Sequence, residues 1–312
     1  TDDPTHYFTR QGVFAIMGVA AMLFIGKINY QRFRALAKPA LFVTVVLLAL
    51  VLIPGIGLVR NNARRWLGVG ELLTFQPSEI AKVAIVLYFA DSISKKKDKM
   101  HTFRYGILPY ALLLMLVGGL VLLEPHLSGA ILIMGAGAVI MLVGGINWAW
   151  VGGALGAAAA MMYFVLFVIG YNASRITYWL DPWEDAQGSG YQLSQSLLSI
   201  GSGGLLGVGL GKSRQKFMFL PEEHNDFIFA IVCEELGLIG AGIIMLLFAA
   251  LILRGYWIAL HARDRFGSLM VVGIITLIAL QTFLNIGVVT GLLPTTGISL
   301  PFFSYGGTAL SM

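Results

Sequence analysis

Residues 226–254 read DFIFAIVCEELGLIGAGIIMLLFAALILR, and the only charged residues between the two ends of this stretch are Glu234 and Glu235. A helix needs about 20 predominantly apolar residues to cross the ~30 Å hydrocarbon core of a bilayer. The stretch is long enough to do so, and its acidic pair lies about two turns from its start. It therefore predicts a membrane helix with two carboxylates near one end.

The rest of the chain has the same character. Of the 312 residues, 57% are hydrophobic and 12% are charged, the mean hydropathy is +0.81, and an ordinary soluble domain has about 25% charged residues. A segment at 294–312 is also apolar but is broken by Pro294 and Pro301. We predict an all-α polytopic membrane protein that forms a single domain over residues 1–312. The other predicted spans are 8–26, 40–59, 77–93, 106–124, 127–146, 148–170 and 267–293.

Lys and Arg are distributed unequally between alternate connections, which indicates the orientation of the chain. Twelve lie around 27–38, 95–104 and 254–265, whereas the opposite side has four in short segments and four in the long loop 171–225. Cytoplasmic loops carry the excess of positive charge. We therefore expect loop 171–225 to be extracytoplasmic, and one further span before residue 1. The net charge of +5 is explained by this distribution and does not indicate nucleic-acid binding.

Charged residues next to or inside predicted spans are the first candidates for a site. Lys82 lies within a span, three residues after Glu79 and on the same helical face. Arg64, Arg65 and Trp66 precede that span, and an arginine pair suits a pyrophosphate because each guanidinium binds oxygens bidentately. The alternatives are a structural Glu79–Lys82 ion pair and an interfacial tryptophan.

The long loop is the second candidate. Its glycine-rich stretch 201–211 is followed by Lys212, Arg214 and Lys216. Glycines beside cations suit a backbone that approaches phosphate closely, and the alternative is a loop that packs on lipid headgroups. Glu234 and Glu235 either line a wet cavity or pair with donors from another helix.

Several motifs follow one another along nearly the whole chain: NARRWL 62–67, FQPSEIAK 75–82, GYQ 190–192, QS 195–196, GSGG 201–204, FLPE 219–222, DFIF 226–229, EELG 234–237, LPTTG 293–297 and PFFSYGG 301–307. In kind and in order they resemble the shape, elongation, division and sporulation (SEDS) family, which includes FtsW, RodA and SpoVE. The stretch 209–216 looks nearer the FtsW/SpoVE branch. Two departures are His126, where many members have Asp in a Pro-Asp-Leu-Gly motif, and Asn225, where Thr is usual.

The resemblance implies a ten-helix bundle in the bacterial plasma membrane, in which this chain supplies about nine spans and lacks the first. It implies a peptidoglycan glycosyltransferase that polymerises lipid II at the outer face for division or sporulation. It also implies a class B penicillin-binding transpeptidase as partner, beside other division or sporulation membrane proteins. Asp226 would be the catalytic base. The alternatives are a lipid II flippase and a non-catalytic scaffold for the transpeptidase.

No cofactor is certain from the sequence, and no metal-ligand spacing is recognisable. A divalent cation, Mg²⁺ or Mn²⁺, could bridge a pyrophosphate. Its ligands would come from Glu222, Glu223, His224 and Asp226.

Overall fold

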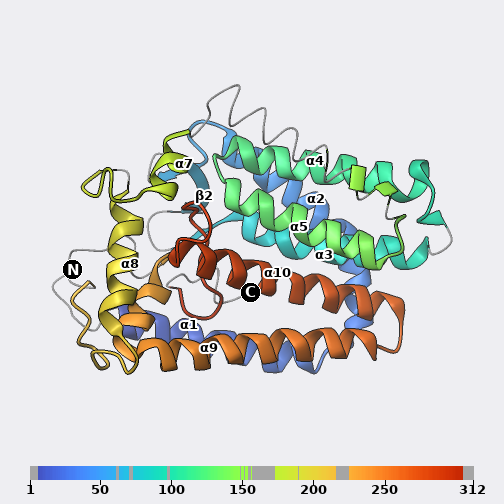
Figure 1. Cartoon of the computed structure of the whole chain (residues 1–312). Coiled ribbons are helices and arrows are strands. Elements are labelled where there is room, and N and C mark those ends of the chain that lie inside the picture. Colours follow the sequence, from blue (N-terminus) through green and yellow to red (C-terminus); the bar gives the residue numbers. More distant parts are fainter. Residues whose placement is uncertain are drawn as a thin grey trace. The chain divides into compact units, whose positions relative to one another are not determined.

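The structure is a computed structural model that describes residues 6–60, 63–69, 73–96, 99–147, 149–150, 152–153, 156, 173–188, 190–215 and 225–304. Within these ranges the regular secondary structure is helical apart from one three-stranded antiparallel sheet, and turns and irregular segments connect the elements (Figure 1). The helices are α1 (His6–Gly26), the 3₁₀ turn η1 (Tyr30–Arg32), α2 (Phe33–Leu52), α3 (Pro77–Lys95), the π-helical turn η3 (Phe103–Ile107), α4 (Leu108–Leu123), α5 (Leu127–Val143), α7 (Ala173–Leu180), α8 (Tyr191–Gly203), α9 (Ile228–Leu260) and α10 (Arg265–Val289); the strands are β1 (Leu58–Arg60), β2 (Ala63–Val69) and β3 (Leu73–Phe75).

The predicted all-α polytopic class is confirmed. Among the described residues, four helical segments are long and apolar enough to cross a membrane, and two apolar helices are shorter. The predicted span 148–170 lies mostly outside the described residues. The four long segments are Tyr30–Leu52, Phe103–Leu123, Ile228–Leu260 and Arg265–Val289, and the shorter helices are Gln11–Gly26 and Leu127–Val143.

The prediction of a span at 40–59 was wrong in its limits, because α2 occupies Phe33–Leu52. The helix contains Pro39, which membrane helices tolerate when the freed carbonyl finds another partner. It ends before Pro54, which disfavours helical geometry in the residue that precedes it. Ile53 is accordingly extended, with φ −71° and ψ 125°.

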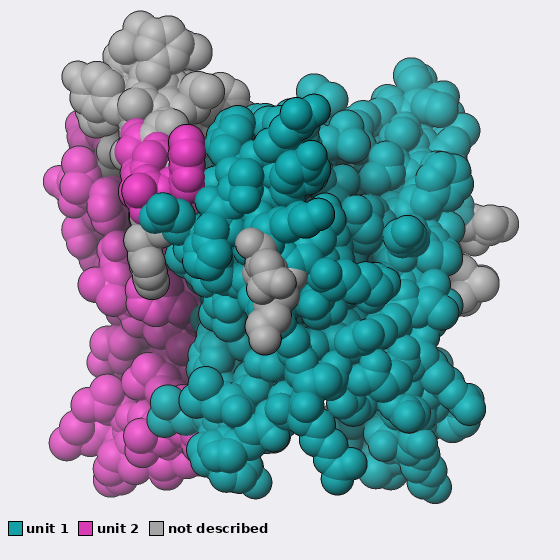
Figure 2. Space-filling model, turned by 90° about the vertical axis from the view of Figure 1, so that its right-hand side faces the viewer, with its two compact units in different colours: residues 1–147, 252–280, 305–312 teal, residues 148–251, 281–304 magenta. Residues whose placement is uncertain are grey.

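The chain divides into two compact units, coloured separately in Figure 2. Unit 1 comprises residues 1–147, 252–280 and 305–312, and unit 2 comprises 148–251 and 281–304. Unit 2 is thus inserted in the sequence of unit 1, and both α9 and α10 contribute to each unit. The single domain over 1–312 stays a prediction.

Unit 1 is built around α3, which packs against α2 and α5, while α4 packs against α5 (Figure 1). Glycines allow the close approach. A Cβ at Gly137 would lie 2.6 Å from the Leu114 side chain, and one at Gly273 would lie 2.5 Å from that of Val86. Small residues at such contacts let membrane helices pack without a hydrophobic driving force between them.

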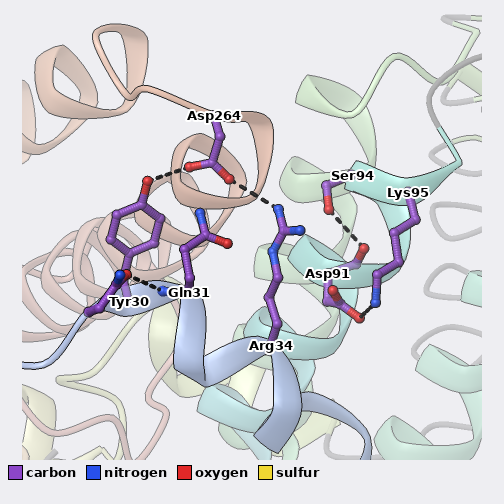
Figure 3. Close-up of polar contacts among 8 residues, drawn as sticks. Tyr30, Gln31, Arg34, Asp91, Ser94, Lys95 and Asp264 are labelled. Atoms are coloured by element: carbon purple, nitrogen blue, oxygen red, sulfur yellow. Dashed lines mark hydrogen bonds and ion pairs between the residues drawn. The ribbon is translucent and has the colours of Figure 1, made fainter.

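In unit 1, Asp264 lies in the turn between α9 and α10 and connects this turn to η1 and α2 (Figure 3). Its carboxylate accepts a hydrogen bond from Tyr30 Oη at 2.5 Å and pairs with Arg34 Nη2 at 3.1 Å. Burial alone would raise the pKa of Asp264, but the hydrogen bond from Tyr30 and the charge of Arg34 hold it below its usual value. Two of the three Lys- and Arg-rich connections therefore meet here, and the orientation of the chain stays a prediction.

Unit 2 contains a folded part of the predicted outer loop. Ser196 of α8 donates to the Val289 carbonyl at the end of α10 (2.8 Å), and Ser199 donates to the Ala230 carbonyl near the start of α9 (3.1 Å). The Trp179 indole of α7 donates to the Gly291 carbonyl (2.8 Å). These contacts fix α7 and α8 against the ends of two helices that the sequence predicts as spans.

Helix α9 is broken at Gly237, which has φ 68° and ψ −173°. In a continuous helix the amides of Leu238 and Ile239 would bond to the carbonyls of Glu234 and Glu235. Here those amides donate to the carbonyls of Gly204 and Leu205 at 2.9 and 3.2 Å. The two carbonyls of α9 instead accept from the amides of Val208 and Gly209, at 3.0 and 3.1 Å respectively. Segment 204–209 thus replaces two helical hydrogen bonds by four.

Gly237→Ala should therefore be strongly destabilising. Its backbone conformation is available essentially only to glycine, and another residue there pays about 1–3 kcal/mol in strain. An added Cβ would also lie 2.3 Å from the Gly207 backbone nitrogen. We expect a loss of more than about 3 kcal/mol of stability, measured as a lower melting temperature in detergent.

Gly242→Ala is the matched control on the same helix. A Cβ at Gly242 meets nothing within 4 Å, and replacing a helical glycine by alanine gains up to about 1 kcal/mol. Equal melting temperatures for the two variants would contradict the assigned role of Gly237.

Candidate functional site

The predicted site residues are divided between the two units. Arg64, Arg65 and Trp66 lie on β2, and Glu79 and Lys82 lie on α3, all within unit 1. In unit 2 are Asp226, Glu234, Glu235, Lys212 and Arg214. Lys216 and the candidate metal ligands Glu222, Glu223 and His224 lie outside the described residues.

The sheet in unit 1 holds the two arginines apart. Strand β2 pairs with β1 through Leu58↔Trp66 and Val59↔Arg64, and successive side chains on a strand point to opposite faces. Arg64 Nη1 donates to the Leu52 carbonyl at the end of α2 (3.2 Å). Arg65 Nε donates to the Glu124 carbonyl (3.2 Å), and its Nη2 donates to the Pro125 carbonyl. The two guanidinium groups therefore contact different backbone carbonyls on opposite faces of the strand, and their binding of a pyrophosphate stays a prediction.

Lys82 is buried in the first turns of α3, with 6% of its side chain exposed. Its Nζ lies 2.7 Å from Glu79 Oε2, and the Glu79 side chain is 15% exposed. The predicted contact at spacing i,i+3 is therefore present. Pro77 begins the helix, where its missing N–H removes no helical bond, and Glu79 lies in the first turn, where negative charge favours the helix dipole.

The turn between α4 and α5 adds two residues that sequence reasoning left without a role. His126 Nδ1 lies 3.2 Å from both Gln76 Nε2 and Ser78 Oγ. Burial, reinforced by the positive charges of Arg65 and Lys82, lowers the pKa of His126 to about 3. The ring is therefore neutral at physiological pH, and it stands beside two of the predicted cationic residues. The detectable signal was a Glu and a His in a short turn between two apolar runs.

Glu124 of the same turn is fully buried. Neither carboxyl oxygen has a hydrogen-bond partner among the described residues. Burial raises the pKa of Glu124 to about 8, against the opposing effect of the Arg65 charge. Because a buried charge without a partner is costly, Glu124 is mostly protonated at neutral pH.

Glu124→Gln should accordingly change stability in a pH-dependent way. The folded protein holds the Glu124 proton more tightly than the unfolded chain, so the associated stabilisation is complete below the ordinary pKa of 4.5 and is lost as the pH rises through about 8. The melting temperature of the neutral Gln variant should be close to that of the wild type at pH 5. It should exceed the wild-type value by a growing margin as the pH rises towards 9. Melting curves across this range test it. Exposed Glu184→Gln serves as the control, and a pH-independent difference for Glu124→Gln would contradict the assignment.

Asp226 stands two residues before α9, at the centre of a network in unit 2. Asn285 of α10 donates through Nδ2 to the Asp226 carbonyl (2.7 Å) and to the Ile298 carbonyl (2.6 Å). Ser304 Oγ donates to the Asn225 carbonyl (2.7 Å). A Cβ at Gly297 would lie 3.0 Å from Asp226 Oδ2, so the glycine leaves room for the carboxylate. Residues 294–304, which form no helix, are thereby fixed against Asp226.

Glu234, one of the predicted substrate-binding residues, lies inside unit 2. Its side chain is buried, with the residue 2% exposed. Its carboxylate accepts hydrogen bonds from Ser213 Oγ (2.5 Å), from the Arg214 amide (3.0 Å) and from Ser199 Oγ (3.2 Å). These internal donors agree with the alternative in which Glu234 pairs with donors from another helix, and its substrate-binding role stays a prediction. Glu235 is half-buried, while Lys212 and Arg214 are exposed.

A metal centre is not evident among the described residues, since no group of three His, Cys, Asp or Glu is placed to hold an ion. Three of the four candidate ligands lie outside those residues. The divalent cation therefore stays a prediction.

Comparison with known proteins identifies the family. The family described as "Cell cycle protein" (FtsW, RodA, SpoVE) matches residues 1–312. The chain is 44% identical over 309 residues to a probable peptidoglycan glycosyltransferase FtsW from Geobacter metallireducens, covering 99% of this chain and 82% of that protein. It is 45% identical over 315 residues to stage V sporulation protein E from Bacillus subtilis, covering 100% and 85%.

Solved structures agree with this result. A structure described as "Structural coordination of polymerization and crosslinking by a peptidoglycan synthase complex" matches with a TM-score of 0.83 and 29% identity, over 99% of this chain and 87% of that one. RodA from Thermus thermophilus matches with a TM-score of 0.71 and 29% identity, over 99% and 85%. The chain belongs to the FtsW/RodA/SpoVE family of polytopic membrane proteins. The predicted resemblance is confirmed.

Proposed function

We propose that this protein is a peptidoglycan glycosyltransferase that polymerises lipid II into glycan strands at the outer face of the plasma membrane. The observation that carries the proposal is the match over 99% of the chain, at 44% identity, to a relative named a probable peptidoglycan glycosyltransferase. The 45% match to stage V sporulation protein E supports a role in division or sporulation.

Asp226 would act as the general base of the reaction. A sugar hydroxyl attacks the anomeric carbon of the donor, a new glycosidic C–O bond forms, and the C–O bond to the pyrophosphate breaks. The hydroxyl proton passes to the Asp226 carboxylate, and undecaprenyl pyrophosphate leaves with the electron pair. A positioned base typically contributes 10²–10⁴-fold to such a step. The support from unit 2 is that Asn285 and the segment 294–304 fix the backbone and the surroundings of Asp226.

Cations would balance the charge of the leaving group. Lys82, with Arg64 and Arg65, is the candidate set in unit 1, and the neutral His126 beside Arg65 and Lys82 adds no competing charge. A buried lysine is costly to retain in a membrane protein without a function or a partner. Glu79 provides such a partner, with its Oε2 2.7 Å from Lys82 Nζ.

The outward orientation of the site is part of the proposal. In unit 1 the end of α2, the sheet and the turn at 124–126 meet at one end through Arg64 and Arg65. The turns that carry Arg34 and Asp264 meet elsewhere in the same unit. This separation agrees with the orientation predicted from Lys and Arg.

We also propose a class B penicillin-binding transpeptidase as partner. The support is the structural match to the peptidoglycan synthase complex described with polymerization and crosslinking. Lipid II is the proposed substrate, and other division or sporulation membrane proteins are further candidates.

One experiment separates the three candidate functions. Purified full-length protein is incubated with lipid II, with and without the transpeptidase, and products are resolved on a glycan gel. Polymer that increases with the partner is expected. Transport of lipid II across vesicles without polymer would favour a flippase, and neither activity despite stable binding of the transpeptidase would favour a scaffold.

A further inference from the structure

The glycine-rich segment that precedes Lys212 is not a free loop, because it is built into the break of α9. Segment 204–209 makes four backbone hydrogen bonds across that break. Close backbone contact requires glycine on both sides. A Cβ at Gly207 would lie 2.2 Å from the Glu235 carbonyl oxygen, and one at Gly203 would lie 2.1 Å from the Cys233 carbonyl oxygen.

Glu234 binds the residues on both sides of this segment. Its carboxylate accepts hydrogen bonds from Ser199 of α8, on the N-terminal side, and from Ser213 and the Arg214 amide, on the C-terminal side. Ser199 and Ser213 are also buried. One side chain of α9 thus fixes both ends of residues 199–214.

The fixed segment has two chemically different surfaces. Leu205, Leu206 and Leu210 are exposed by 67%, 80% and 76%. Lys212 and Arg214 are exposed on either side of the buried Ser213. Apolar side chains next to two cations fit a ligand with a hydrocarbon part joined to a phosphate group.

We propose that Glu234 is a positioning residue that holds Lys212 and Arg214 ready to bind the pyrophosphate of a lipid-linked substrate. Glu234 does not touch the ligand. It acts through Ser213 and the Arg214 backbone, and the three leucines lie against the lipid part. The inference rests on the proposed function for the identity of the lipid, whereas the support by Glu234 can be tested independently.

Ser213→Ala removes the 2.5 Å hydrogen bond to Glu234 with a minimal change of volume. Its matched control is Ser202→Ala, because the Ser202 hydroxyl donates to the Ser199 carbonyl (2.8 Å) and lies in the same region. For the full-length protein in nanodiscs, we expect Ser213→Ala to accelerate hydrogen exchange at Val208, Gly209 and Arg214. The KM for lipid II should rise on the order of 10-fold with kcat within about twofold. Ser202→Ala should match wild type in both measurements.

Glu234→Ala and Glu234→Gln separate support from chemistry. The Gln side chain keeps one acceptor for the Arg214 amide, and its NH₂ group can donate to a serine hydroxyl. It should restore most of the exchange protection and of the KM that Glu234→Ala loses. A fall in kcat with unchanged KM would assign Glu234 to the chemical step and overturn the proposal. Accelerated exchange with unchanged KM would overturn the link to phosphate.

Equilibrium binding of lipid II separates this inference from the proposed function. It is measured in nanodiscs with and without phosphatidylglycerol. Weaker lipid II binding by Ser213→Ala at both compositions is expected even if the wild type forms no polymer, in which case only the proposed function fails. A defect confined to phosphatidylglycerol would assign the cations to ordinary headgroups and overturn the substrate part of the proposal.

Discussion

Asp226→Asn should abolish polymerisation while the protein folds normally. Asp226 lies two residues before α9, and the hydrogen bond from Asn285 goes to the Asp226 backbone carbonyl, which the substitution keeps. The amide cannot take a proton from the sugar hydroxyl, so we expect glycan synthesis to fall by about 10²–10⁴-fold. The glycan gel measures the product, and the melting temperature in detergent should stay at the wild-type value.

Asn285→Ala is the comparison variant for this experiment. It removes the donor to the Asp226 and Ile298 carbonyls and leaves the Asp226 carboxylate in place. Loss of activity here should come with a lower melting temperature, unlike that of Asp226→Asn. Substantial polymer from Asp226→Asn would remove Asp226 from the mechanism, and the remaining carboxylate candidates would be Glu222, Glu223, Glu234 and Glu235.

Lys82→Met should have the second largest effect, on both stability and activity. It leaves the Glu79 carboxylate, 15% exposed, without its ion-pair partner. Breaking a buried pair on one side typically costs about 3–5 kcal/mol. Polymerisation at limiting lipid II should fall as well, because a proposed pyrophosphate contact is lost.

The double variant Glu79→Gln/Lys82→Met distinguishes the two causes. With both charges removed, the stability loss should largely disappear. If Lys82 binds the pyrophosphate, activity should stay low despite the recovered melting temperature. A double variant with full turnover at limiting lipid II would show that Lys82 serves only to neutralise Glu79.

Features that depend on local composition could be predicted from the sequence. The apolar runs gave the class of fold, and the spacing of Glu79 and Lys82 gave a contact that the structure contains. Asp226 was expected at the start of a helix and lies two residues before α9. Each of these features depends on residues that lie within about one or two helical turns of each other.

Features that depend on distant partners were missed. Gly237 looked like one more glycine in a membrane helix, but its conformation is fixed by Gly207 and Leu205, far away in the chain. The carboxylate of Glu234 found donors at Ser199 and Ser213, which no spacing rule connects. The small sheet was also not predicted, because strands of three to seven residues are too short to show a recognisable periodicity.

The insertion of unit 2 within unit 1 has a consequence for biosynthesis. Arg34 emerges from the ribosome 230 residues before Asp264, the partner that it pairs with at the end of unit 1. Likewise, Val86 of α3 can pack against Gly273 only after α10 has been synthesised. Membrane insertion proceeds from the N-terminus, and domains usually fold in that order. Here α2 and α3 are completed only by α10 and the turn before it, so a nascent chain that stops before α10 leaves unit 1 open.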